Sequence, residues 1–460
     1  MRANFNLKRN WSSNFKSIKR LDWSFLIFTL VVLQFIFLFL YFETKSIIWI
    51  FISLFTFLFL FFISWKIILI LIPSLILFFT AFYFISSLNK TPNNIEGDFF
   101  VIKKISNGIF VQNNGKKFFV ETYENLEIDD LVNIKSSQIT KIKLDSSFNK
   151  YLKSEGVDYI VDCQDISLIG TKYFLRRNIM EYFNNDLPYY SRYVPLIFLG
   201  IRNLKNQVIV NKITNISIIH LFTISGFHIN ILVFLIKKIL SFFKIKNRYI
   251  NLLFLSPLFF YLYLMNFSIA ASRAVIFSIL SCINKSFLNN KIHKLNLLSI
   301  ITFLFFVFNP YIVFSYSFIF SFVLSYSILI INSSLNNKNK KMKIFLIALF
   351  FSYLINIKLN EEINLTSFIS VIIFTPLISF SYILTLLFFW LKPIIDNYYF
   401  LIDIIVNFFQ YLVLKINVAF SNELIIMLYF ISFLSILIFI KKPQLISCKK
   451  WWMNNYVFDL

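Results

Sequence analysis

Long apolar stretches recur along almost the whole chain, and they restrict the fold more than any other feature. Each runs for about 17 to 25 residues, the length that a helix needs to cross about 30 Å of hydrocarbon. They are uniformly apolar rather than alternating, which disfavours a membrane β-barrel. With 58% hydrophobic residues and a mean hydropathy of +0.72, the chain carries more apolar surface than a soluble core can bury. We therefore expect a mainly α-helical, polytopic membrane protein.

The formal charge of +23 would suit a nucleic-acid partner, but its distribution first follows a membrane topology. Lysine and arginine precede the first apolar stretch and gather in alternate loops, while the intervening loops hold few cations. This pattern predicts about 12 spans in the cytoplasmic membrane, with both termini in the cytoplasm. The predicted divisions are a basic N-terminus (1–22), three spans (23–88), an extracellular β domain (91–170), an interfacial basic segment (172–212), a transmembrane channel domain (213–441) and a cytoplasmic tail (442–460).

Residues 91–170 differ in kind from the rest of the chain. They hold five of the seven glycines and several short β-type runs separated by turn residues. This predicts a small all-β domain, a five-stranded barrel of the OB kind. Barrels of this kind often bind single strands, but this segment has about nine basic against about twelve acidic residues, and backbone binding needs a positive groove. A structural or gating role is the interpretation we prefer.

The basic segment that follows contains candidate phosphate contacts. Arg176, Arg177 and Arg202 stand in a region with few acidic residues. Apolar residues at helical spacing, Leu175 and Ile179 among them, predict an amphipathic helix on the bilayer surface. Anionic lipid and nucleic-acid phosphate would both fit its basic face, and the sequence favours lipid slightly.

The densest polar cluster within an apolar stretch is the segment from 215 to 231. Polar groups in hydrocarbon are costly without partners or water, so this helix should face a polar interior. Two histidines eight residues apart lie about 12 Å apart on an unbroken helix, too far for one metal ion. A break at the glycine would alter that spacing, but no acidic or sulfur ligand stands nearby, so we expect no metal. The residues in question are His220, Ser225, Gly226, His228 and Asn230.

Two further features stand out. Arg273 follows Ser272 in a run of small residues, and no acidic residue is near it in the sequence. It suits an anionic ligand, although a side chain that snorkels to the outer interface is an equal alternative. Asn309 and Pro310 should start or kink a span, because proline lacks the backbone donor.

These segments resemble the competence proteins of the ComEC family. In HLFTISGFHINIL, residues 220–232, the family pattern of a histidine and leucine, then Ile-Ser-Gly and a second histidine, is matched. Arg273 with Ala274, and Asn309 with Pro310, match two later family segments in the same order. Asn266 replaces a family glycine, and Ser317 and Ile319 replace a glycine and a glutamine. The resemblance spans about residues 95 to 390 of the chain.

The resemblance implies an inner-membrane channel through which one DNA strand enters the cytoplasm in natural transformation. Many relatives also carry a C-terminal metallo-β-lactamase-like domain, and we expect this chain to lack it, because no His-x-His-x-Asp-His run is present. The expected partners are single-stranded DNA, membrane lipids, a separate nuclease, a DNA receptor and a cytoplasmic ATPase. A homo-oligomer is compatible with this reading.

Two other function classes remain open at this point. A transporter or flippase for a small anion or a lipid-linked sugar would also use a buried arginine. A membrane-embedded enzyme is less favoured, because Ser225 and His228 lie on one helix with no orienting acid and no HExxH run is present. We therefore predict no catalytic residue and no cofactor. The predicted lining of a DNA path is His220, Ser225, Gly226, His228, Asn230, Ser272, Arg273, Asn309 and Pro310.

Overall fold

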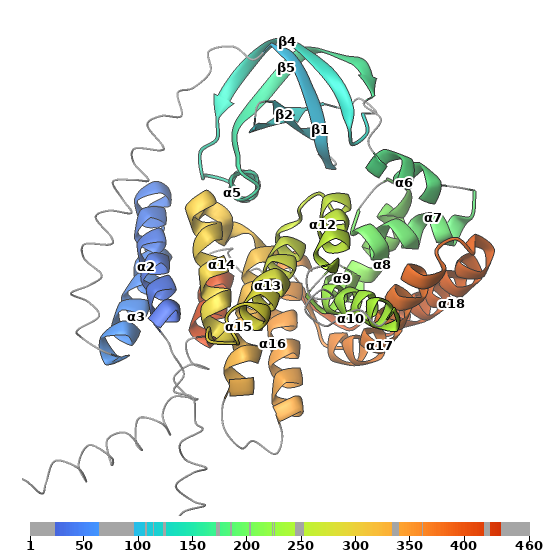
Figure 1. Cartoon of the computed structure of the whole chain (residues 1–460). Helices are drawn as coiled ribbons and strands as arrows, with labels where there is room; N and C mark the ends of the chain where they lie inside the picture. The colour runs from blue at the N-terminus through green and yellow to red at the C-terminus, as the bar shows by residue number, and fades with distance from the viewer. Residues whose placement is uncertain are drawn as a thin grey trace, which may run out of the picture.

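The computed structural model describes residues 24–63, 96–105, 108–113, 115–122, 126–171, 175–184, 186–201, 204–222, 224, 226–243, 253–333, 340–360, 362–417 and 424–433. It shows a helical body with a small barrel above it (Figure 1). The predicted N-terminal segment 1–22, residues 64–88 of the predicted three-span region and the predicted tail 442–460 lie outside the described residues, as do Arg202 and Ser225.

The barrel closes through five strands in the order β1-β2-β3-β5-β4. Strands β3 and β5 run parallel, and every other neighbouring pair is antiparallel. The structure thus has the small β domain that the sequence predicts, and its assignment to the OB kind stays a prediction. The strand bounds are β1 (Gly97–Ile105), β2 (Gly108–Asn113), β3 (Lys116–Glu121), β4 (Asp130–Lys141) and β5 (Val157–Thr171).

Alternation along the strands builds the barrel interior, because successive side chains point to opposite faces. Phe99 and Val101 on β1, and Phe118 and Val120 on β3, are all buried in one cluster. The opposite face of β2 and β3 is also covered, because a helix that the sequence analysis missed, α5 (Ser147–Ser154), packs there. The first position of β2 requires Gly108, since a Cβ there would lie 2.3 Å from the carbonyl oxygen of Val120.

The helices form two apolar clusters on either side of one central helix, α13. One cluster joins η1, α7 to α10, α12, α17 and α18, and the other joins α2, α3 and α14 to α16. Helix α13 buries Ala271 and Val275 in the first cluster and packs Ile276 and Phe277 against the second. The bounds are α2 (Ser24–Thr44), α3 (Ile47–Ile63), α6 (Leu175–Phe183), α7 (Pro188–Val194), η1 (Pro195–Leu199), η2 (Leu204–Asn206), α8 (Gln207–Asn215), α9 (Ile219–Phe222), α10 (Gly226–Phe242), α12 (Leu255–Leu264), α13 (Ile269–Ser286), α14 (Lys294–Phe308), η3 (Pro310–Phe314), α15 (Tyr316–Ser333), α16 (Lys340–Asn360), α17 (Ser367–Phe388) and α18 (Lys392–Tyr411).

Within the described residues, α13 and α17 are long and apolar enough to cross a membrane. Shorter apolar helices, such as α14 and Leu424–Phe433, lie at other predicted spans. The helical class is therefore confirmed, while the number of about 12 spans stays a prediction.

The prediction that the segment from 215 to 231 lies on one helix is wrong. Helix α8 ends at Asn215, the short α9 ends at Phe222, and α10 begins at Gly226. Ser217 adopts a left-handed backbone with φ of 65°, which interrupts the helical path. A small two-stranded antiparallel sheet that the sequence analysis also missed, β6 (Glu362–Asn364) with β7 (Lys415–Asn417), lies beside this break in contact with α8 through Asn364.

Candidate functional site

The interrupted backbone before α9 is held by a buried side chain from β6. Asn364 donates to the carbonyl oxygen of Asn215 at 3.2 Å and to Oγ of Ser217 at 3.3 Å. Its side-chain oxygen accepts hydrogen bonds from the backbone N–H and the hydroxyl of Thr366. Both the nitrogen and the oxygen of the Asn364 amide are therefore hydrogen-bonded. Non-helical backbone in an apolar body needs such partners, because unpaired polar groups are costly there. Sequence reasoning missed Asn364, whose role depends on a contact about 150 residues away in the chain.

The rings of the two histidines in the segment contact different aromatic side chains. His228 is 4% exposed, and its ring meets the ring of Tyr382 edge-on with centroids 4.7 Å apart. The ring of His220 lies 6.1 Å from that of Phe320 on α15. Among the described residues, no three His, Cys, Asp or Glu side chains gather where they would bind a metal.

Tyr382, which packs against His228, begins a chain of hydrogen bonds between buried hydroxyl groups. Tyr382 donates to the hydroxyl of Tyr261 at 3.1 Å, and Tyr261 donates to the carbonyl oxygen of Phe198 at 2.6 Å. These bonds connect α17, α12 and η1 through buried groups. Satisfied polar networks of this kind fix helix positions inside an apolar core.

Arg273 lies inside the helical body rather than at its surface. It is 7% exposed, its Nη1 donates to Oγ of Ser325 at 2.5 Å, and its guanidinium lies 5.8 Å from the ring centre of Phe322. Gly226 is its neighbour, since a Cβ at that glycine would lie 2.8 Å from Nη2. The structure therefore brings together two of the predicted site residues that are 47 positions apart in the sequence.

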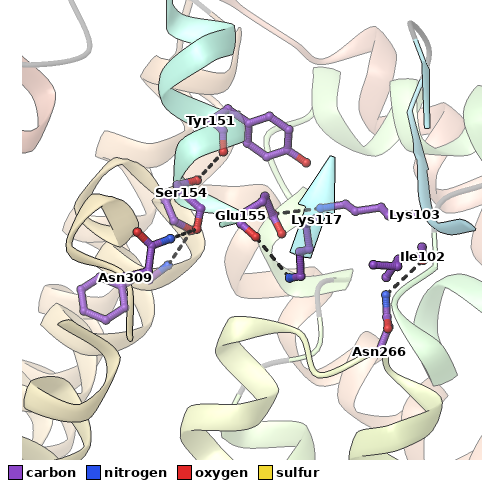
Figure 2. A network of polar contacts seen from close by, with 10 residues as sticks. Ile102, Lys103, Lys117, Tyr151, Ser154, Glu155, Asn266 and Asn309 are labelled. Atoms are coloured by element: carbon purple, nitrogen blue, oxygen red, sulfur yellow. Dashed lines mark hydrogen bonds and ion pairs between the residues drawn. The ribbon is translucent and has the colours of Figure 1, made fainter. Parts of the chain in front are cut away.

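The remaining predicted lining residues are spread over different surroundings. Asn230 is exposed, and Ser272 donates to the carbonyl oxygen of Phe267 at 3.0 Å. Pro310 is buried at the start of η3. Asn309 reaches the barrel, where it bonds the carbonyl oxygens of Lys153 and Ser154 (Figure 2). Their roles as a path lining stay predictions.

Among the described residues, side-chain contacts join the barrel to the helical body at three places. Asn266 donates to the carbonyl oxygen of Ile102 at 3.1 Å, and Asn309 supplies the second contact (Figure 2). The third place is α6, where ion pairs join Arg176 to Asp129 at 3.3 Å and Arg177 to Asp130 at 2.7 Å. These are two of the arginines predicted to contact phosphate, so part of their charge is already engaged.

Burial shapes the ionisation of the first of these ion pairs. Desolvation raises the pKa of the Asp129 carboxyl, although Arg176 and Arg177 act in the opposite direction. Desolvation also lowers the pKa of the Arg176 guanidinium, against the effect of Asp129. Both shifts follow from the poorly solvated position of the pair between α6 and the barrel.

A second buried charge cluster lies in the helical body and was missed by sequence reasoning. Asp403 on α18 is 8% exposed and accepts from the hydroxyl of Tyr193 at 2.9 Å. It also pairs with Lys212 at 3.2 Å and accepts from Asn407 at 3.0 Å. An aspartate in the middle of the apolar run 398–414 was the available signal, since such a charge needs a partner.

Comparison with known proteins places these residues in one family. The family model described as "Competence protein" matches residues 197–443, which is more than half of the chain. No match was found among curated proteins or among solved structures. The matched region runs from η1 to beyond α18 and includes the histidine segment, Arg273 and Asn309. The family match and the two long apolar helices together indicate a membrane protein with a role in competence. The chain therefore belongs to the competence protein family, as its histidine segment indicated.

Proposed function

We propose that this protein conducts a single DNA strand across the cytoplasmic membrane during natural transformation. The observation that carries the proposal is the position of the family's own segments. The histidine segment and the arginine helix meet where α10, a member of the first apolar cluster, lies against α13, which borders both clusters. A polyanion that crosses a membrane needs a positive interior, and Arg273 supplies a buried cation there.

The conformation described here is closed at this position. Arg273 and His228 are both more than nine-tenths buried among packed side chains. Passage of a nucleotide therefore requires helices to separate around α13, where the two clusters meet. A few hydrogen bonds and aromatic contacts cross that boundary, among them the bond from Arg273 to Ser325 and the contact of His220 with Phe320. Proteins that switch between two conformations commonly have polar groups that bond one another in the closed state and become exposed in the open state.

The proposed topology is that of the sequence, with about 12 spans, both termini in the cytoplasm and the barrel outside. We propose an OB-type barrel with a structural or gating role, which its three attachments to the helical body support. The protein would act as a channel without catalysis of its own. A separate nuclease, a DNA receptor and a cytoplasmic ATPase would then degrade the second strand, deliver the duplex and supply the energy.

Uptake of labelled DNA tests this proposal. In a strain that lacks the protein, labelled donor DNA should no longer enter a pool that is protected from external nuclease, and expression of the full chain should restore entry. DNA bound at the cell surface should stay unchanged, which separates transport from capture. Undiminished entry in the deletion strain would refute the proposed function.

A further inference from the structure

The start of α10 and the guanidinium of Arg273 face each other inside the helical body. A Cβ at Gly226 would lie 2.8 Å from Nη2 of Arg273 and 3.8 Å from Cβ of Ala274. The guanidinium thus occupies the space that any larger residue would fill at the first position of α10. The first backbone N–H groups of a helix have no intrahelical acceptor and carry partial positive charge. A cation beside these N–H groups is repelled by them, unless an anion binds between the cation and the helix start.

Arg273 has little compensation for its charge. Its Nε has no hydrogen-bond partner within the described ranges, and no carboxylate in those ranges forms an ion pair with it. Ser325 accepts from Nη1, but its own hydrogen goes to the carbonyl oxygen of Ser321 at 2.7 Å. The serine therefore offers only a neutral lone pair. Buried charges are ordinarily matched by an opposite charge, and this one lacks it.

We propose that Arg273 and the first turn of α10 bind one phosphodiester oxyanion. An anion between them would accept from the guanidinium and from the N–H groups at the helix start, which are the two most frequent phosphate ligands in proteins. Gly226 lets the backbone and the guanidinium approach the same group, because it has no side chain. The proposed function provides the ligand's source, a DNA strand, and an anionic phospholipid headgroup carries the same diester.

The exposure of α10 indicates the side from which such a ligand would approach. Gly226 is partly exposed and Asn230, one turn further on, is exposed. These two residues share one face of the helix, because positions i and i+4 lie above one another. The ring of His228 is buried on a different side against Tyr382, so this side chain does not contribute to the site.

Binding by the purified full-length chain in dodecyl maltoside, a detergent without phosphate, tests the site. The probe is a fluorescein-labelled oligothymidylate of about a dozen nucleotides, followed by anisotropy over a salt series. We expect Arg273→Met to weaken binding at least about tenfold, because a buried cation opposite an anion is removed. Arg273→Lys should lose less affinity, since lysine keeps the positive charge but lacks the planar guanidinium that donates two hydrogen bonds to one anion. Lys285→Met is the matched control: this exposed cation lies at the other end of the same helix, and its removal should change affinity less than about threefold.

Three comparisons decide the outcome. An oligonucleotide with neutral methylphosphonate linkages should bind weakly and be insensitive to Arg273→Met; equal loss for the neutral and the charged strand would overturn the site. Wild-type affinity in Arg273→Met would overturn it as well. Phosphatidylglycerol in mixed micelles identifies the source of the diester. If the lipid binds through Arg273 and the oligonucleotide does not, the diester site stands with a headgroup as its ligand, and the channel is judged by the uptake assay alone.

Gly226→Ala keeps the test decisive if Arg273→Met does not fold. Alanine favours a helix more than glycine does, so α10 should persist, while the added methyl forces the guanidinium away from the helix start. We expect a loss of oligonucleotide affinity with an unchanged elution profile in size-exclusion chromatography. A Gly226→Ala protein that elutes and binds like wild type contradicts the proposed site.

Discussion

Asn309 donates its side-chain amide to two consecutive carbonyl oxygens at the end of α5, that of Lys153 at 2.9 Å and that of Ser154 at 3.1 Å. Its side-chain oxygen accepts from the backbone of Tyr311 at 3.0 Å and so caps the turn η3. Asn309 thus caps the turn that leads into α15 and also attaches the barrel through α5 (Figure 2). Asn266, just before α13, also holds the barrel, through its bond to the carbonyl oxygen of Ile102.

Each of these contacts precedes a helix that holds one partner of the partly buried bond between Arg273 and Ser325. Asn266 lies just before α13, which carries Arg273, and Asn309 lies before α15, which carries Ser325. The barrel is therefore attached at the turns that precede the two helices joined by that bond. If the barrel moves when it meets a partner, these two helices are the ones it would pull on directly. This relationship supports the proposed gating role for the barrel.

Substitutions at Asn309 can separate its two tasks. Asn309→Asp keeps the acceptor that caps η3 but replaces the donor with a charged oxygen facing two carbonyl groups, so it should release the barrel contact. Asn309→Ala removes both interactions and should lower the free energy of unfolding by about 1 to 2 kcal/mol. Hydrogen exchange by mass spectrometry checks both variants: α5 should exchange faster in each, and η3 faster only with alanine. Unchanged exchange at α5 in Asn309→Asp would show that the contact does not hold the barrel.

Asn266 gives a prediction about backbone strain. By its resemblance to the family segment it takes the place of a glycine, and its φ of 51° lies in the left-handed region, which glycine and asparagine tolerate best. Asn266→Gly should keep the turn and lose only the bond to Ile102, a small change of about 1 kcal/mol. Asn266→Ala should cost about 1 kcal/mol more, because it adds the strain. Thermal unfolding of the two variants measures the difference, and equal stabilities would contradict a strained turn.

Arg177 and Asp130 are expected to act as a structural clamp between α6 and the barrel. Asp130 is 4% exposed, so Arg177→Met leaves a buried carboxylate without its cation and should destabilise by about 2 to 4 kcal/mol. Adding Asp130→Asn should recover part of that loss, and the double-mutant cycle measures the coupling. A clamp also predicts that the salt dependence of single-strand binding is unchanged in Arg177→Met. A slope reduced by about one phosphate contact would instead support the predicted phosphate role of Arg177.

Parts of this arrangement could be predicted from the sequence because they depend on local pattern. Uniform apolar runs predicted helices, alternating runs with glycines predicted a β domain, and rare polar residues in apolar runs drew attention to Gly226 and Arg273. The pairing of those two could not be predicted, because it depends on how α10 crosses α13. Ser325 gave no signal, since a serine in an apolar helix ordinarily bonds its own preceding turn, as it does here to Ser321.

The barrel contacts escaped prediction for a related reason. Asn309 bonds residues about 155 positions away, and the helix that receives it, α5, is a short polar segment within a β region. The Asn-Pro pair did predict a break in the helical path, because proline and a capping asparagine act locally: α14 ends at Phe308 and η3 begins at Pro310. Its partner across the domain boundary is a product of tertiary packing alone.

The cluster around Asp403 gives the last prediction. Lys212→Met removes the only cation that the described residues place on this buried carboxylate, and leaves Tyr193 and Asn407 as its donors. We expect a loss of about 2 to 4 kcal/mol, because an uncompensated charge stays in an apolar body. Asp403→Asn should be milder, since the amide still accepts from Tyr193 and no charge is stranded on α18. Lys212→Met combined with Asp403→Asn should therefore be more stable than Lys212→Met alone. Thermal unfolding in detergent orders the three proteins, and a double variant less stable than Lys212→Met would mean that the carboxylate does not depend on this lysine.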